Sequence, residues 1–237
     1  MVKQICTQEN QYSSFIIYCT PTSPGRSKFL ALMTTNITKL PWFMRLTFSI
    51  PLWIDHIFLR NTIFDGDNVF LHFQEHHLAE TARAMENNTH QSNKNSNKNA
   101  VAWRKQYFMP TRADTLVAAF KNWLDVAGKG GPHGPLHRCA DHKLITDHRV
   151  LLDRYEQHTK NCPACRSALS WVERLRALSA VMAVIGLGAA VSAAIQATPF
   201  KSVVLCGVLG IVSGLAWHCF SLLRAQFYFV DYDHATR

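Results

Sequence analysis

The chain has 237 residues, with 25 Lys and Arg against 16 Asp and Glu, so its formal net charge is +9. Hydrophobic residues make up 48% and charged residues only 17%, which excludes an intrinsically disordered chain. The sequence shows neither a Gly-X-Y repeat nor a heptad run, so collagen and extended coiled coil are excluded as well. The positive charge is dispersed along the chain, and we therefore expect no nucleic-acid binding.

The first elements in chain order are a strand and a turn. The opening residues are polar and lack the apolar region of a signal peptide. Residues 15–19 (FIIYC) are β-branched and aromatic, which predicts a strand that ends at Pro21. Residues 22–26 (TSPGR) predict a turn, and the apolar segment 42–59 predicts helix interrupted at Pro51.

Further helices follow along the chain. Residues 67–86 predict a helix with Asp65 or Asp67 near its start, where acidic side chains suit the helix dipole. Residues 87–99 (NNTHQSNKNSNKN) are polar and of low complexity, so we expect a disordered insertion. The sequence TRAD at 111–114 predicts a capping box for a helix to about Val126, and residues 148–160 predict another helix.

Two long apolar runs dominate the last quarter of the chain. Residues 177–196 and 202–223 contain no Asp, Glu, Lys or Arg. About 20 residues of helix rise about 30 Å, the thickness of a bilayer core. The alternative is a buried helical hairpin in a soluble protein, but two uncharged spans in tandem favour a membrane hairpin.

Charges and aromatic residues flank these runs. Arginines lie before the first run and after the second, whereas the turn holds only Lys201, so both ends are expected on the cis side of the membrane. Aromatic residues on that side predict an interfacial belt formed by Trp171, Phe227, Tyr228, Phe229 and Tyr232. Glycines predict close packing of the two helices at Gly186, Gly188, Gly207, Gly210 and Gly214.

Seven cysteines are present, an odd number that does not indicate a secreted disulfide framework. Cys162 and Cys165 form a Cys-x-x-Cys pair, and Pro163 suits the first position of a helix. Cys162 would then lie at a helix N-terminus beside Lys160 and Arg166, which favours a reactive thiolate. An alternative is a zinc site of Cys₂His₂ or Cys₃His type drawn from His137, Cys139, His142, His148, Cys162 and Cys165.

Five segments together resemble the pheophorbide a oxygenase group of Rieske-type non-haem iron oxygenases, found in chloroplasts and cyanobacteria. They are SPGRSK (23–28), DGDNVFLHFQEHHL (65–78), QYFMPTRADTLVAAFKNWL (106–124), LLDRYEQHTKNCPAC (151–165) and FYFVDYDHA (227–235). The resemblance covers most of the chain except the Asn-rich insertion, and it is to the C-terminal half of the group. It implies an α+β fold, with an incomplete helix-grip half of the catalytic domain before a two-helix membrane anchor.

The resemblance also implies a set of iron cofactors. Fe(II) in this group is held by two histidines and one carboxylate, and a 2Fe–2S cluster lies on an N-terminal domain. The motifs for the cluster and for the two histidines are absent here, and we expect them on a missing N-terminal part. The carboxylate lies seven residues before a Gln in the group, which points to Asp67 before Gln74, with Asp65 as the alternative. We therefore expect this chain to be an incomplete oxygenase by itself.

Partners and location follow from the same resemblance. It implies a chlorophyll-derived tetrapyrrole as substrate, a ferredoxin-type electron donor, and a chloroplast membrane, either inner envelope or thylakoid. It also implies that Cys162 and Cys165 form a redox switch that responds to thioredoxin. The alternative function is a membrane-anchored, redox-responsive or zinc-binding module without catalysis.

The domain organisation that we predict has four parts. The first is the C-terminal half of the catalytic domain (1–86), followed by the Asn-rich insertion (87–100). A helical segment with the Cys-x-x-Cys pair (101–170) precedes the membrane anchor (171–237).

Overall fold

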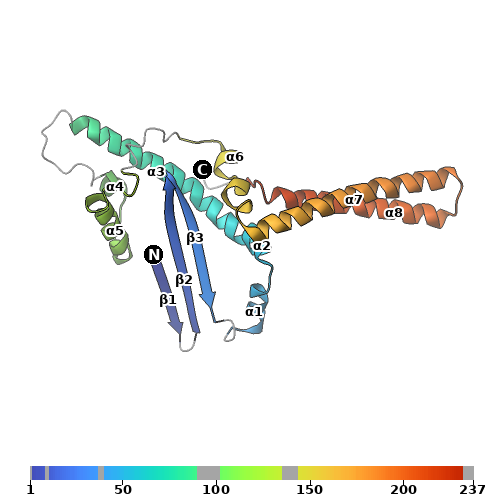
Figure 1. Ribbon diagram of the computed structural model, residues 1–237, viewed down its shortest axis with the longest axis horizontal. Coiled ribbons are helices and arrows are strands. Elements are labelled where there is room, and N and C mark those ends of the chain that lie inside the picture. The colour runs from blue at the N-terminus through green and yellow to red at the C-terminus, as the bar shows by residue number, and fades with distance from the viewer. Residues whose placement is uncertain (1, 9–10, 37–39, 90–101, 135–143, 232–237) are drawn as a thin grey trace. The chain divides into compact units, whose positions relative to one another are not determined.

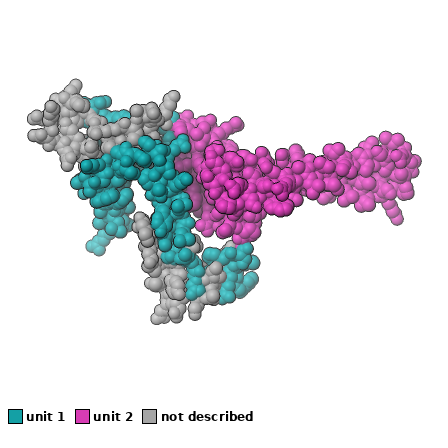
Figure 2. Space-filling view, in the orientation of Figure 1, with its two compact units in different colours: residues 1–49, 70–144 teal, residues 50–69, 145–237 magenta. Residues whose placement is uncertain are grey.

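The structure is a computed structural model in which the chain divides into two units. Unit 1 comprises residues 1–49 and 70–144, and unit 2 comprises residues 50–69 and 145–237 (Figure 2). The structure describes all residues except 1, 9–10, 37–39, 90–101, 135–143 and 232–237. Most of the predicted Asn-rich insertion therefore lies outside the described residues.

Unit 1 contains a three-stranded antiparallel sheet in the order β1-β2-β3 (Figure 1). The strands are β1 (Val2–Gln8), β2 (Gln11–Ser23) and β3 (Arg26–Thr35). The predicted strand 15–19 is the centre of β2, which pairs with both neighbours. Pairing on both sides extends β2 well beyond the short apolar run from which it was predicted.

The predicted turn is confirmed, but the predicted end of the strand at Pro21 is wrong. Ser23 pairs with Arg26 across a tight turn in which Gly25 has a φ of +68°, a value that glycine adopts without strain. Pro21 still faces Ser27, and the register shifts between Pro21 and Ser23. Proline lacks the N–H of a regular ladder, so it is accommodated at an irregularity in the strand.

The predicted helix break at Pro51 is confirmed. Helix α1 (Trp42–Phe48) ends before it, and α2 (Leu52–Asp55) begins after it. Helix then continues through a π-helical turn, η2 (His56–Arg60), into α3 (Asn61–Thr89). The prediction that this helix begins near Asp67 is wrong, because no proline lies between Pro51 and the end of α3, and the single Gly66 in that segment costs only about 1 kcal/mol in a helix.

The predicted capping box is confirmed in the C-terminal part of unit 1. The Asp114 carboxylate accepts hydrogen bonds from the Thr111 backbone N–H at 3.1 Å and from its hydroxyl at 2.7 Å. A 3₁₀ turn, η3 (Arg112–Asp114), leads from this cap into α5 (Thr115–Val126). The short α4 (Ala102–Gln106) precedes them.

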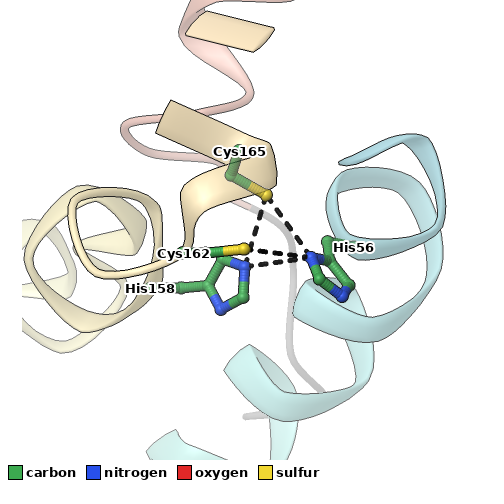
Figure 3. Close-up of side chains that lie close together, drawn as sticks. All are labelled: His56, His158, Cys162 and Cys165. Atoms are coloured by element: carbon green, nitrogen blue, oxygen red, sulfur yellow. Dashed lines mark hydrogen bonds between the residues drawn. The ribbon is translucent and has the colours of Figure 1, made fainter. Parts of the chain in front are cut away.

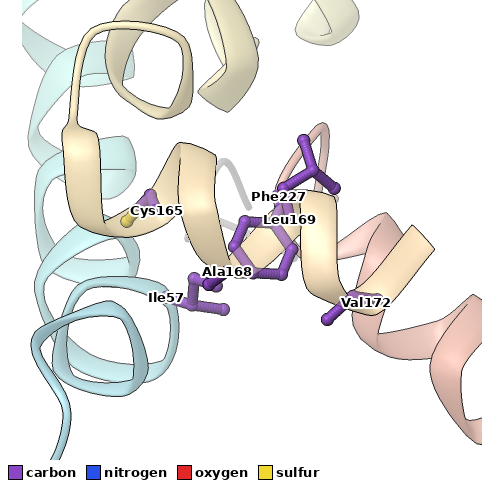
Figure 4. Packing of buried hydrophobic residues seen from close by; sticks show 6 residues of the cluster. All are labelled: Ile57, Cys165, Ala168, Leu169, Val172 and Phe227. Atoms are coloured by element: carbon purple, nitrogen blue, oxygen red, sulfur yellow. The ribbon is translucent and has the colours of Figure 1, made fainter. Parts of the chain in front are cut away.

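The core of unit 2 gathers side chains from segments far apart in the sequence. Its elements include α6 (His148–Leu151), the π-helical turn η5 (Tyr155–Thr159), α7 (Pro163–Ile195) and α8 (Phe200–Ala225). The buried cluster consists of Ile57, Cys165, Ala168, Leu169, Val172 and Phe227 (Figure 4).

One predicted member of the aromatic belt belongs to this core instead. Phe227 is fully buried, and its carbonyl accepts a hydrogen bond from the Thr159 hydroxyl at 2.8 Å. Tyr228 stacks on Tyr155 with ring centroids 5.1 Å apart. The prediction of interfacial aromatics is therefore wrong for Phe227, because the chain after α8 folds back on the start of α7; Tyr232 lies outside the described residues.

Helices α7 and α8 form an antiparallel hairpin (Figure 1). Each is long and apolar enough to cross a membrane, judged by length and composition. Their apolar side chains are largely exposed, reaching 73% at Val184, 80% at Ile195 and 81% at Phe200. The core helix of a soluble protein would be mostly buried, so this exposure argues against the buried-hairpin alternative.

Three of the five glycines predicted at the helix contact are found there, and Gly207 is the loosest of them, since a Cβ on it would lie 3.9 Å from Ala190 Cβ. A Cβ on Gly186 would lie 2.7 Å from the backbone nitrogen of Gly210, and a Cβ on Gly210 would lie 2.8 Å from that of Leu187. At Gly188 and Gly214 a Cβ would meet nothing within 4 Å. Close approach of the two backbones therefore depends on Gly186 and Gly210.

Candidate functional site

Four side chains of unit 2 that could ligate a metal ion lie close together: His56, His158, Cys162 and Cys165 (Figure 3). Their ligand atoms all lie within 4.8 Å of one another. His56 Nδ1 lies 3.3 Å from His158 Nε2, 3.6 Å from Cys162 Sγ and 3.4 Å from Cys165 Sγ. Cys165 Sγ lies 3.3 Å from His158 Nε2. We call these four residues the His–Cys cluster.

Local backbone geometry places each member of the cluster. His56 opens the π-helical turn η2, and His158 lies in the π-helical turn η5. Such turns are rare and often occur at functional sites, because the extra residue changes the direction of the side chains. Cys162 is the extended N-cap residue of α7, Pro163 follows at the first helical position, and Cys165 lies in the first turn.

Burial sets the ionisation of the cluster. Burial lowers the pKa of His56, with a further decrease from Arg60 that Asp55 opposes. Burial also lowers the pKa of His158, so both rings are neutral at pH 7 and each keeps one nitrogen lone pair. Burial and the adjacent Cys162 raise the pKa of the Cys165 thiol to about 12. Without a cation, Cys165 therefore stays protonated at neutral pH.

Of the residues considered for a zinc site, Cys162 and Cys165 belong to the His–Cys cluster, whereas His148 does not. His148 belongs to a different contact, with its Nδ1 3.3 Å from a carboxylate oxygen of Asp231. His137, Cys139 and His142 lie outside the described residues. Sequence reasoning missed His56 and His158, although the spacing His158-x₃-Cys162-x₂-Cys165 was a local signal for the second of them.

The two candidate iron ligands differ sharply in environment. Asp65 is 5% exposed, and its Oδ2 accepts a hydrogen bond from Arg154 Nε at 2.6 Å. The Arg154 side chain is 1% exposed, and its other donors meet the carbonyls of Gln226 at 3.1 Å and Ile57 at 3.5 Å. Asp65 is thus half of a buried, hydrogen-bonded ion pair.

Asp67 is exposed on the other side of α3. Two residues of helix turn the side-chain direction by about 200°, so Asp67 points away from the Asp65 side. Gln74 follows seven residues later, about two turns along, on the same face of the helix. Within the described residues, neither aspartate belongs to a group of three or more side chains that could share a metal ion.

Two comparisons with known proteins point to pheophorbide a oxygenases, one over the first third of the chain and one over most of it. A family model described as pheophorbide a oxygenase matches residues 2–85. The chain is 27% identical over 228 residues to the chloroplastic pheophorbide a oxygenase of Oryza sativa subsp. japonica, and 27% identical over 224 residues to that of Arabidopsis thaliana. It is also 26% identical over 228 residues to the chloroplastic flavonoid 8-hydroxylase 2 of Ocimum basilicum.

Coverage differs between the chain and these relatives. The matches cover 91% of this chain for the two pheophorbide a oxygenases and 96% for the flavonoid hydroxylase. The chain spans 38% of the length of each relative. No solved structure matches the chain. The resemblance inferred from the sequence motifs is confirmed: this chain is similar to pheophorbide a oxygenases over most of its length, which supports a C-terminal portion of that type.

Proposed function

We propose that the chain is part of a Rieske-type oxygenase that acts on a chlorophyll-derived tetrapyrrole, with Asp67 as the carboxylate ligand of its Fe(II). The family match over residues 2–85 is the observation that carries this proposal, because that segment contains Asp67 and Gln74. The 2Fe–2S cluster and the two iron-binding histidines would come from sequence outside this chain.

The environments of the two aspartates support Asp67 over Asp65. A carboxylate bound to buried Arg154 would have to break that ion pair before it could bind iron, whereas the exposed Asp67 would not. When bound by two histidines and a carboxylate, Fe(II) keeps open positions where O₂ and substrate can meet. The part of Asp67 would be to fix the metal and to neutralise one of its charges.

The names of the relatives indicate two substrate classes, because one is a pheophorbide a oxygenase and another is a flavonoid 8-hydroxylase. The substrate class of this protein therefore has to be tested by experiment. We favour a chlorophyll-derived tetrapyrrole because two of the three relatives above are named pheophorbide a oxygenase. A ferredoxin-type protein would supply electrons. The names of all three relatives place them in the chloroplast, which supports a chloroplast membrane for this protein.

The test of this function is isotopic. The full-length protein, supplied with reduced ferredoxin and ¹⁸O₂, is expected to incorporate ¹⁸O into pheophorbide a, as detected by mass spectrometry. A matched reaction with a flavone replaces only the substrate. Labelled flavone with unlabelled pheophorbide would overturn the substrate assignment, and no label in either ring compound would overturn the proposed oxygenase.

We also propose that α7 and α8 anchor the protein in the membrane as a hairpin. Their exposed apolar side chains and the arginines outside them support this arrangement. After carbonate extraction of chloroplast membranes, the protein is expected in the membrane pellet. Carbonate releases proteins that are held only by peripheral contacts, whereas burial of about 20 apolar residues per helix keeps the protein in the bilayer. Recovery in the soluble fraction would contradict the anchor.

A dithiol–disulfide role for Cys162 and Cys165 stays a prediction, with thioredoxin as the proposed reductant. Neither cysteine is in a disulfide, and their sulfur atoms are within 4.8 Å of each other. A disulfide needs about 2.05 Å between the sulfurs, so a small movement would close it.

A further inference from the structure

We propose that His56, His158, Cys162 and Cys165 form a tetrahedral site for one Zn²⁺ ion. This inference goes beyond the proposed oxygenase and does not depend on it. The site would join three segments of unit 2: the turn η2, the turn η5 and the start of α7 (Figure 3).

Hydrogen bonding alone does not account for the contacts of His56. Its Nδ1 lies within 3.6 Å of His158 Nε2, Cys162 Sγ and Cys165 Sγ. A ring nitrogen offers either one proton or one lone pair, so it can satisfy one such partner but not three. A cation at the common centre could bind all four ligand atoms at once, whereas hydrogen bonds among the four atoms could not satisfy them all.

The distances fit tetrahedral zinc. Zinc–sulfur bonds of about 2.3 Å and zinc–nitrogen bonds of about 2.0–2.1 Å place ligand nitrogens about 3.4 Å apart, and sulfur about 3.5 Å from nitrogen. The nitrogen–nitrogen distance here is 3.3 Å, and the sulfur–nitrogen distances are 3.6, 3.4 and 3.3 Å. The remaining pairs of ligand atoms lie within 4.8 Å.

The chemistry of the donors selects zinc over other ions. Two sulfurs and two imidazole nitrogens in tetrahedral array are typical of zinc, whereas Ca²⁺ and Mg²⁺ prefer oxygen. A Rieske cluster uses the same residue types but places the cysteines and the histidines on different irons. Here the four atoms surround a single point, which suits a mononuclear ion.

Charge and burial are consistent with this assignment. Two thiolates cancel the charge of Zn²⁺, so the complex is neutral. A neutral complex suits Cys165, which is fully buried and belongs to the apolar cluster with Ile57 and Ala168. A disulfide between Cys162 and Cys165 would remove both sulfur ligands, so bound zinc and that disulfide exclude each other.

The first experiment measures metal in the full chain purified in detergent. We expect about one zinc per chain by mass spectrometry, and Co²⁺ in its place should show tetrahedral d–d and thiolate charge-transfer absorption. Cys165→Ser and His56→Ala should each lower zinc affinity by at least about 100-fold. Loss of a direct ligand should cost more than the roughly 10–100-fold that is typical when a hydrogen-bond partner of a ligand is removed. Matched controls are Cys206→Ser and His148→Ala, a cysteine and a histidine of unit 2 outside the cluster, which should leave affinity unchanged.

A second measurement uses the unaltered chain, so it remains informative even if the variants fail to fold. Zinc should protect Cys162 and Cys165 of the unaltered chain from alkylation, a chelator should remove that protection, and Cys206 and Cys219 should not respond. Chelator-insensitive alkylation, a native Cys162–Cys165 disulfide without zinc, or iron with acid-labile sulfide at these residues would each overturn the proposal. Loss of oxygenase activity is not a readout here, so this test and that of the oxygenase fail separately.

Discussion

Replacing Asp67 by alanine in the full-length oxygenase proposed above is expected to abolish product formation while the 2Fe–2S cluster remains intact. The loss follows from the coordination chemistry, because two histidines alone leave the iron short of one ligand and one negative charge. Removal of a direct ligand should lower iron affinity by more than the roughly 10–100-fold that is typical of outer-shell changes. Mononuclear iron content and product yield are the two measurements.

The control for this experiment is Glu80→Ala, which also removes an exposed carboxylate from α3. It should keep both iron and activity. Asp65→Asn tests the alternative ligand, and we expect it to weaken the fold by disturbing Arg154 instead of removing iron from folded protein. Unchanged iron in Asp67→Ala, or folded but iron-free Asp65→Asn, would move the ligand assignment to Asp65.

Replacing Arg154 by leucine is expected to destabilise unit 2 by about 3–5 kcal/mol, the usual cost of breaking a buried ion pair from one side. The change leaves the Asp65 carboxylate buried without its partner and takes donors from the carbonyls of Gln226 and Ile57. A loss of this size is a large share of the roughly 5–15 kcal/mol that stabilises a typical protein. Thermal unfolding in detergent, followed by circular dichroism, measures it.

A double-mutant cycle separates the pair from its surroundings. Leucine at both Asp65 and Arg154 should cost less than the sum of the single changes, because no charge is then left unpaired. Arg149→Leu is the matched control, since Arg149 is an exposed arginine of the same unit. An Arg154→Leu protein within about 1 kcal/mol of the original would show that the pair is not a structural element of unit 2.

Local patterns in the sequence were sufficient for several elements. The turn at Pro24–Gly25, the break at Pro51, the capping box at Thr111–Asp114 and the helix start at Pro163 all depend on residues within a few positions of one another. The two apolar helices follow from composition alone. Each of these features is governed by backbone conformation or solvation of the segment itself, so no distant partner is needed to predict it.

The boundaries of the strands could not be predicted from the sequence as well as these local features. Strand β1 (Val2–Gln8) is mostly polar, and β2 extends beyond its apolar centre, because pairing between neighbouring strands forms the ladder. Strand formation depends on context more than helix formation does, so an isolated segment carries little of the signal.

By itself, the sequence determined the family resemblance, the paired apolar helices and the cysteine pair at the start of a helix. Only the tertiary structure decided which aspartate is buried and which is exposed, since Arg154 meets Asp65 from 89 residues away. It also decided which histidines join the cysteines, bringing His56 to Cys162 across 106 residues. The physical reason is the same in both cases: burial and convergence of side chains are properties of packed segments, and residue spacing records them only when the partners lie within the same few turns of chain.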